Sequence, residues 1–485
     1  MNETTGPRTE TLSRRRRLLV LGICSMSLLI VSLDVTIVNI ALPAIHRSLH
    51  TSLRGLQWTI YAYTLVIASL LMLAGSTADR LGRRMVFQIG LVVFSVASLC
   101  CALADSTGML IAFRIVQAVG GSMLNPVAMS IIRNVFESPR ERAQAIGIWG
   151  AVVGIGIALG PVIGGALVDA TSWRAIFLVN VPVGIAAIVL TALFVPESRA
   201  ARARRFDLVG QLLVIVMLAT LTYAIIEGPA LGWTSAPTLT LFVVATGSAI
   251  ALVAYELRRD EPLLEVRFFR SAPFSGATAI AVCAFASMGI FLFLNTLYLQ
   301  GVRGLSPLHA GLYTLPMAAM WFVFAPVSGR LVGTRGARPP LLAGGVLLTT
   351  AGVMLTRITA TTAVGYLFAA YMLLGLGLGL VNPPITVAAV SGMPASQAGV
   401  AAAIASTSRQ VGSTLGVALA GAVVGGGVKA ALGPGFATAA RPGWWIVAAL
   451  GAVVLALGFL TTTAWADQTA TRTADNLREE VPVTV

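Results

Sequence analysis

Charged residues are scarce in this 485-residue chain: they make up 11% of it, whereas 57% of the residues are hydrophobic. A soluble domain carries roughly 25% charged residues, so this chain cannot cover the surface of a water-soluble fold. The mean hydropathy of +0.87 agrees with that conclusion. The shortage of charge excludes a disordered chain, a disulfide-rich secreted scaffold and a soluble enzyme with a membrane tether.

Cysteine and histidine are also rare, with four and three residues. The cysteines lie inside apolar runs, where they act as small packing residues. The histidines lie near loops without metal-binding spacing, and the chain has no phosphate-binding glycine loop. We therefore expect no metal, no cofactor, no ATP and no catalytic centre. The residues concerned are Cys24, Cys100, Cys101, Cys283, His46, His50 and His309.

Long apolar runs fill most of the chain and predict an all-α polytopic membrane protein with 14 transmembrane helices. Each run is long enough for a span, which needs about 20 residues. The expected starts are Leu18, Leu56, Val86, Thr107, Ala143, Ala175, Phe206, Thr238, Ala272, Leu308, Pro340, Thr362, Val400 and Trp444, and the last span is expected to end near Ala466.

Basic residues are distributed unevenly between the two sides of these spans. With the N-terminus placed in the cytoplasm, 24 of the 33 Lys and Arg residues fall on the cytoplasmic side, seven fall outside and two lie within spans. This bias predicts that both termini are cytoplasmic. It also accounts for the net charge of +14 without a nucleic-acid partner.

Two sequence segments recur at nearly the same offset. Gly75–Arg84 resembles Gly329–Arg338, 254 residues later, and Gly120–Pro126 resembles Gly377–Pro383, 257 residues later. Spans 1–6 are therefore expected to recur as spans 9–14, with spans 7 and 8 as an insert, although chance similarity among glycine-rich helices is an alternative. The expected parts are 1–17 (N-terminal tail), 18–198 (first six-helix half), 199–271 (two-helix insert), 272–466 (second half) and 467–485 (C-terminal tail).

Two ionisable residues lie deep in predicted spans at matching depth. Asp34 is eight residues from the outer end of span 1, about 12 Å, and Arg114 is seven residues from the outer end of span 4, about 10 Å. We expect both side chains to face one cavity and to approach each other. An arginine partner favours the ionised form of a carboxylate, whereas desolvation favours its neutral form.

This balance suits proton coupling by Asp34, because one proton moving down 100 mV yields about 2.3 kcal/mol. A static ion pair that holds two spans together is the alternative. Arg409 in span 13 is expected either to line the cavity or to tie the halves together.

Five motifs in order carry a family resemblance. They are Leu33–Pro43 in span 1, Gly75–Arg84 between spans 2 and 3, Arg114–Gly121 in span 4, Gly156–Gly165 in span 5, and Trp173–Pro182 after it. With 14 spans, the chain resembles the fourteen-span drug:proton antiporter branch of the major facilitator superfamily.

The resemblance implies proton-driven export of lipophilic, often cationic compounds across a bacterial inner membrane. It implies that Asp34 carries the proton or meets a cationic substrate, and that Arg114 assists proton movement. It also implies that the segment between spans 2 and 3, which we name the latch motif, forms a gate that closes the cytoplasmic side. For the arginines of this motif, ordinary positive-inside anchoring is the alternative. The latch motif comprises Gly75, Asp79, Arg80, Gly82, Arg83 and Arg84.

The sequence departs from the family pattern in span 2, where Tyr61 stands in place of an acidic residue. This departure weakens the case for divalent cationic substrates.

Span 5 carries glycines four residues apart, which favours close helix packing, a hinge at the Gly-Pro step, or both. The hinge and packing set is Gly156, Gly160, Pro161, Gly164 and Gly165. Candidate substrate contacts are Asp34, Asn39, Tyr61, Gln117, Phe291, Asn295, Tyr298 and Arg409.

The predicted function is a monomeric, proton-coupled exporter of a small lipophilic substrate. A proton-coupled transporter of one specific endogenous metabolite is the alternative. A membrane sensor or intramembrane enzyme is a third class that no catalytic constellation supports.

Overall fold

The structure is a computed structural model that describes residues 13–136, 138–199, 207–259, 262–391, 398–424 and 435–479. Every secondary-structure element in these ranges is a helix, which confirms the predicted all-α fold. Twelve of these described helices are long and apolar enough to cross a membrane. The predicted spans from Ala143 and Val400 correspond to two further helices of 32 and 27 residues, so the count of fourteen spans stays a prediction.

The first half of the chain, here called the N-terminal half, contains seven helices. They are α1 (Arg14–Leu49), α2 (Leu53–Leu81), α3 (Arg83–Ala102), α4 (Thr107–Val135), α5 (Pro139–Ala170), α6 (Ala175–Leu178) and α7 (Asn180–Phe194). The sixth predicted span is thus formed by α6 and α7 in sequence.

The insert consists of two helices, and the C-terminal half follows it. The insert helices are α8 (Leu208–Leu231) and α9 (Ala236–Glu256). The remaining elements are η1 (Val266–Arg270), α10 (Ala272–Leu297), η2 (Tyr298–Val302), α11 (Pro307–Arg335), α12 (Arg338–Leu355), α13 (Val364–Val390), α14 (Ala398–Val424), α16 (Phe436–Ala439), α17 (Arg441–Leu460) and α18 (Ala464–Glu479).

Short polar residues and glycines set many of the helix ends. Ser52 and Ser106 each accept a hydrogen bond from a backbone N–H in the first turn of α2 and α4, as N-caps do. Gly82, Gly232 and Gly336 end α2, α8 and α11 with positive φ values of 122°, 89° and 80°. This backbone conformation strains residues that carry a Cβ, so the connections can turn sharply at these points.

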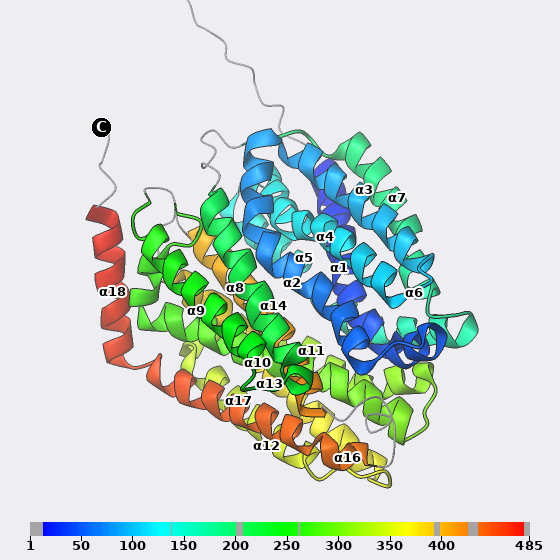
Figure 1. Cartoon of the computed structure of the whole chain (residues 1–485). Helices are drawn as coiled ribbons and strands as arrows, with labels where there is room; N and C mark the ends of the chain where they lie inside the picture. Colours follow the sequence, from blue (N-terminus) through cyan, green and yellow to red (C-terminus); the bar gives the residue numbers. More distant parts are fainter. Residues whose placement is uncertain are drawn as a thin grey trace, which may run out of the picture.

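The two halves lie side by side, and the insert packs where they meet (Figure 1). In the interface, α5 packs against α11, and α2 packs against α14. The insert helix α8 contacts both α2 and α14, and α9 packs on α8. The insert therefore touches one helix from each half.

The C-terminal segment differs from the prediction. The last apolar helix, α17, ends at Leu460, and a separate helix, α18, begins at Ala464, so the expected boundary at Ala466 falls inside a helix. The break has a local cause, because the hydroxyls of Thr461 and Thr463 bond back to carbonyls of the preceding turn. One face of α18 is buried against α10 and η1, so part of the predicted tail belongs to the folded body.

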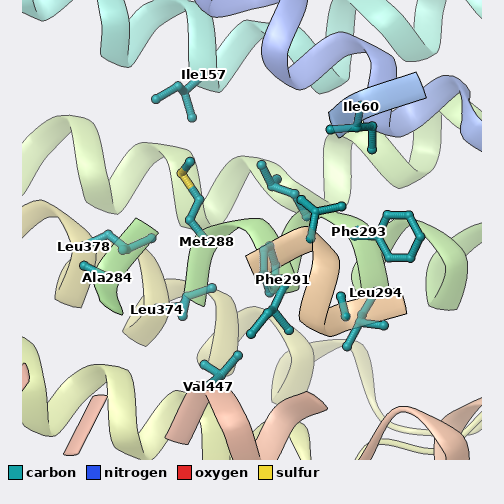
Figure 2. Close-up of a cluster of buried hydrophobic side chains, with 14 of the residues drawn as sticks. Ile60, Ile157, Ala284, Met288, Phe291, Phe293, Leu294, Leu374, Leu378 and Val447 are labelled. Atoms are coloured by element: carbon teal, nitrogen blue, oxygen red, sulfur yellow. The ribbon is translucent and has the colours of Figure 1, made fainter. Parts of the chain in front are cut away.

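The buried apolar residues form two clusters that differ in which half supplies them. The shared cluster contains residues of both halves, among them Ile37, Ile60, Ile157, Met288 and Phe291, and Figure 2 shows part of it. The inner cluster contains only residues of the N-terminal half, among them Val20, Leu71, Phe87, Phe94 and Ile131.

Within the N-terminal half, the two clusters occupy opposite ends of the bundle. We call the end where α1 passes into α2 the loop-1 end, and the end where α1 begins the terminal end. On α1 the shared cluster runs from Leu33 to Ile45, toward the loop-1 end, whereas the inner cluster runs from Val20 to Val31. The apolar cores of the halves are therefore joined toward the loop-1 end, while the N-terminal half packs on itself toward the terminal end.

Candidate functional site

The structure brings Asp34 and Arg114 into direct contact. Arg114 Nη1 lies 2.5 Å from Asp34 Oδ2, and the side chains are 0% and 1% exposed. The two residues come from α1 and α4, whose matching depths were expected from the sequence. The pair is closed in by the N-terminal half, so it does not face an open cavity in this conformation.

Two amides also reach the Asp34 carboxylate. Gln117 Nε2 and Asn180 Nδ2 donate to Asp34 Oδ1 over 3.0 Å and 3.2 Å. Both amide nitrogens also donate to Ser98 Oγ, at 3.1 Å each, and the Ser98 hydroxyl donates to the carbonyl of Phe177. One carboxylate on α1 is thus linked to α3, α4 and α7.

The Arg114 guanidinium is held by further contacts. Its Nε donates to the Thr59 carbonyl over 3.2 Å, and its Nη1 also donates to Gln117 Oε1 over 2.7 Å. The Tyr63 ring lies 3.9 Å from the guanidinium carbon, within cation–π range. We call this set the Asp34 network, and its members are Asp34, Arg114, Gln117, Asn180, Ser98, Thr59 and Tyr63.

Four members of the network were not predicted from the sequence. Ser98, Asn180, Thr59 and Tyr63 are buried polar residues within apolar helices. Buried polar side chains need partners, so Ser98 and Asn180 were signals that a network existed. Thr59 takes part through its backbone carbonyl and Tyr63 through its ring. The rotation of each helix about its axis, which the sequence does not give, decides which partner each of these residues contacts.

Two other candidate residues of the N-terminal half are buried but stand outside this network. Tyr61 is 0% exposed, and its hydroxyl has no hydrogen-bond partner in the structure as described. Asn39 donates to the Val35 carbonyl over 2.9 Å, while its Oδ1 is likewise without a partner.

Three candidate residues lie in the C-terminal half and find partners there. The Tyr371 hydroxyl donates to Asn295 Oδ1, and the Tyr298 hydroxyl donates to the Thr359 carbonyl over 2.6 Å. The ring of Phe291 packs edge-on against Tyr371, with the centroids 5.0 Å apart. None of these interactions reaches the Asp34 network.

Arg409 on α14 is bound to α13. Its Nε donates to Asn382 Oδ1 over 3.0 Å, and its Nη2 donates to Thr386 Oγ1. Both partners belong to the C-terminal half, so these bonds do not form the tie between the halves that was one of the two roles expected for Arg409.

The latch motif is organised around an ion pair between two adjacent helices. Arg83 Nη2, in the first turn of α3, lies 2.9 Å from Asp79 Oδ1, in the last turn of α2. Gly82 turns the chain between them, and Gly75 packs near Pro126 of α4.

Glu197, which was not predicted, holds the start of α3. Its two carboxylate oxygens accept from the backbone N–H groups of Arg84 and Met85, over 3.1 Å and 3.2 Å. Negative charge is favourable at a helix N-terminus, so Glu197 stabilises the start of α3. A Cβ on Gly82 would stand 2.8 Å from Glu197, which also requires glycine there.

The glycines of α5 make close contacts with two other helices. A Cβ on Gly156, Gly160 or Gly164 would lie 1.9–2.7 Å from atoms of α1, so this face packs directly on α1. A Cβ on Gly165 would stand 2.4 Å from the Pro307 carbonyl of α11, and one on Gly311 would stand 2.2 Å from the Pro161 carbonyl. Through these small residues α5 connects the two halves.

A cavity of about 710 Å³ lies elsewhere, at the terminal end of the C-terminal half. Residues of α10, α12, α13 and α18 line it, and none of them belongs to the Asp34 network. No group of three or more potential metal ligands occurs in the part of the chain that the structure describes.

A bundle of membrane-length helices with an ion pair buried in one half is the architecture of a membrane transporter. The family model of the Major Facilitator Superfamily matches residues 24–417. The chain belongs to this superfamily and is therefore a multi-pass membrane transporter rather than an enzyme.

Relatives of the chain carry names of drug resistance and export. Multidrug resistance protein Stp of Mycobacterium tuberculosis is 39% identical over 87% of this chain and 78% of its own length. The tetracenomycin C resistance and export protein of Streptomyces glaucescens is 38% identical, over 82% and 74%. The methylenomycin A resistance protein of Streptomyces coelicolor is 38% identical, over 81% and 82%.

A solved structure supports the fold. A bacterial homologue of the human lysosomal transporter Spinster, in an inward-facing and unoccupied conformation, aligns with a TM-score of 0.62. The alignment covers 96% of this chain and 99% of the other, at 18% identity.

Proposed function

We propose that this protein is a proton-coupled antiporter that exports lipophilic, often cationic drugs or natural products by alternating access. The observation that carries the proposal is the Asp34–Arg114 pair, because an ion pair without water access inside a membrane bundle is costly unless it has a task.

The contacts of Asp34 suit the proton-free stage of such a cycle. The carboxylate accepts hydrogen bonds from three side chains, which is the environment of an ionised group. Proton uptake on Oδ2 would break the ion pair with Arg114, so protonation would weaken the link between α4 and α1. Asp34 thus exchanges its proton only when the surrounding helices move.

The arrangement of the halves supports an inward-facing conformation. The shared cluster closes the loop-1 end, whereas the inner cluster of the N-terminal half includes no residue of the other half. We infer from the distribution of basic residues that the terminal end, with both termini, faces the cytoplasm of a bacterial cell. An antiporter that releases its proton into the cytoplasm requires an ionised Asp34 in this state.

The two halves are proposed to be structural repeats around the insert, which gives fourteen spans in total. Asn295 and Tyr371 join α10 to α13, as Asp34 and Arg114 join α1 to α4. At the repeat offset of 254–257 residues, Asp34 corresponds to Met288–Phe291, one to two turns before Asn295. On this proposal the N-terminal half holds the charges of ion coupling, and the C-terminal half holds a neutral pair.

The motion between states is proposed to occur where α5 meets α11. Contacts between small residues there hold the loop-1 end closed, and Pro161 gives α5 a point of bending. The latch motif is proposed to close the terminal end in the opposite state. In the inward-facing conformation Asp79 pairs with Arg83, on the next helix.

The substrate class follows from the relatives and from the side chains available. The relatives are named for resistance to or export of several antibiotics. With Tyr61 in place of an acid, monovalent cations and neutral lipophilic compounds are favoured over divalent cations. A transporter of one endogenous natural product is the second candidate, favoured by relatives that are named for a single antibiotic.

The test is transport in proteoliposomes with an imposed pH gradient, with wild type and Asp34→Asn. The probes are ethidium, as a monovalent lipophilic cation, and a neutral polycyclic quinone. We expect the gradient to drive uptake by inside-out wild-type protein and to have no effect on the variant. Glu265→Gln, which changes a loop carboxylate near η1, is the matched control and should transport as wild type.

Substrate binding is measured in parallel to separate coupling from folding. The variant should still bind the neutral probe, because its amide keeps the size of the side chain. Gradient-driven transport by Asp34→Asn at the wild-type rate would reject Asp34 as the coupling residue. Transport of only one compound from a broad panel would favour the specific-metabolite alternative.

A further inference from the structure

Two buried carboxyl groups face each other in the insert, away from the Asp34 network. Asp207 is the residue before α8 and is 4% exposed, and Glu256 ends α9 and is 2% exposed. The two helices pack against each other, so their ends bring the side chains together at the terminal end of the bundle.

One oxygen of each carboxyl group has a clear structural partner. Asp207 Oδ1 accepts from the Gly210 backbone N–H over 2.8 Å, as the N-cap of α8. Glu256 Oε2 accepts from the Leu263 backbone N–H over 3.0 Å. These bonds fix both side chains in place.

The other two oxygens are buried without a hydrogen-bond partner in the structure as described. They are Asp207 Oδ2 and Glu256 Oε1. A Cβ placed on Gly210 would stand 2.8 Å from the first and 2.6 Å from the second, so both oxygens face the same small space above this glycine. Buried polar atoms normally have partners, so each of these oxygens lacks a hydrogen-bond donor, and each faces the other carboxyl group across this space.

Within the described residues, two neighbouring groups interact with this carboxyl pair. Tyr255 forms a side-chain hydrogen bond with Asp207, and Arg259 interacts electrostatically with Glu256. The guanidinium of Arg259 also lies over the Tyr255 ring, 5.5 Å from its centroid. On the other side of α8, the Ser69 carbonyl of α2 accepts a hydrogen bond from Gln211.

We propose that Asp207 and Glu256 form a second proton-binding site, in which one proton is shared between Asp207 Oδ2 and Glu256 Oε1. Two carboxylates that share a site cannot both be ionised without strong repulsion, so the pair retains one proton. The shared proton supplies the hydrogen bond that both oxygens lack. The site joins the ends of α8 and α9, and it gives the insert a titratable element of its own.

The site has a consequence for how the insert is held. Gln211 lies one turn after Asp207 and donates to the Ser69 carbonyl, so the same end of α8 is fixed to α2. Loss of the shared proton would leave two charges facing across Gly210 and would push the ends of α8 and α9 apart. Packing of the insert on the N-terminal half is therefore coupled to protonation.

Infrared difference spectroscopy of the purified full chain tests the proposal directly. The experiment is done in the Asp34→Asn background, so it does not depend on the proposed coupling residue. Raising the pH from about 6 to about 9 should remove the C=O stretch of a protonated carboxyl group. The band should be lost in Glu256→Gln and in Asp207→Asn, and it should persist in Glu265→Gln.

Thermal unfolding from about pH 5 to about pH 8 is the second measurement. Until the shared proton is lost, the folded pair holds one proton more than the unfolded chain, in which both acids ionise near their ordinary values. Stability must then fall as pH rises, with the unfolding equilibrium constant increasing up to tenfold per pH unit. Glu256→Gln, which resembles the protonated partner, should remove this dependence.

Three results would overturn the proposal. The first is a carboxyl band that is unchanged in both single variants. The second is an unfolding profile in which Glu256→Gln and wild type depend on pH equally. The third is stabilisation by sodium or magnesium at alkaline pH that both variants abolish, since it would show that a metal cation occupies the space. If one variant does not fold, the other carries the test.

Discussion

Replacing Arg114 with glutamine removes the positive charge of the buried pair and keeps most of the side-chain volume. Asp34 would then retain its bonds from Gln117 and Asn180 but lose its only charged donor. The Tyr63 ring would also lose the cation that lies 3.9 Å from its centre.

The expected loss of stability in Arg114→Gln follows from the burial of both charges. Because the side chains are 0% and 1% exposed, water cannot compensate the carboxylate that remains. Breaking such a buried pair destabilises a protein by about 3–5 kcal/mol. At roughly 2 °C per kcal/mol for a large chain, the midpoint of thermal unfolding should fall by about 6–10 °C.

A double-mutant cycle in detergent separates the charge from the packing. Asp34→Asn combined with Arg114→Gln leaves two neutral amides in place of the ions, and it should be more stable than Arg114→Gln alone. A coupling of about 2–3 kcal/mol is expected, because the residues are in direct contact.

The exposed pair of Arg54 and Glu227 provides the matched control. Its side chains are 52% and 14% exposed, so Arg54→Gln should cost at most about 1 kcal/mol. If Arg114→Gln were no worse than Arg54→Gln, or if the double variant were less stable than the single one, the account of the Asp34 network would be wrong.

Two further changes test the packing of α5 and the start of α3. Gly160→Val would place a Cβ 1.9 Å from Thr36 Oγ1, and it should lower the free energy of unfolding by at least about 1–3 kcal/mol. Gly22→Val is the control and should change stability little, because a Cβ there would meet nothing within 4 Å. Equal shifts in thermal unfolding would contradict the close contact of α5 with α1. Glu197→Ala should remove the two bonds to the start of α3, at a cost of about 1 kcal/mol, and should speed hydrogen exchange at the Met85 amide. Unchanged exchange there would argue against a capping role.

Much of the architecture could be predicted from the sequence. Hydropathy alone placed the helices, and the observed starts of α4 at Thr107 and α10 at Ala272 match the expected residues. The reason is that a span must satisfy its own backbone in lipid, so length and apolar composition are sufficient to define it. The separate helix α18 was missed because it is polar and too short to span a membrane.

The site was predictable in kind but not in detail. A charge inside an apolar span is rare enough to mark Asp34 and Arg114, and helix rise alone gives their matching depth. Depth does not give rotation about the helix axis, however, and rotation decides which side chains meet. The partners Ser98 and Asn180, and the Asp207–Glu256 pair, depended on that rotation.

The sequence by itself determined that this chain is a helical membrane protein, which residues carry charge into the membrane, and how deep each one lies. Only the tertiary structure decided that the pair is enclosed within one half, that the halves join at the loop-1 end, and that the insert ends bring two acids together. The physical reason is that hydrophobic burial is non-directional and is encoded along the chain, whereas hydrogen bonds and ion pairs require a particular distance and orientation between helices.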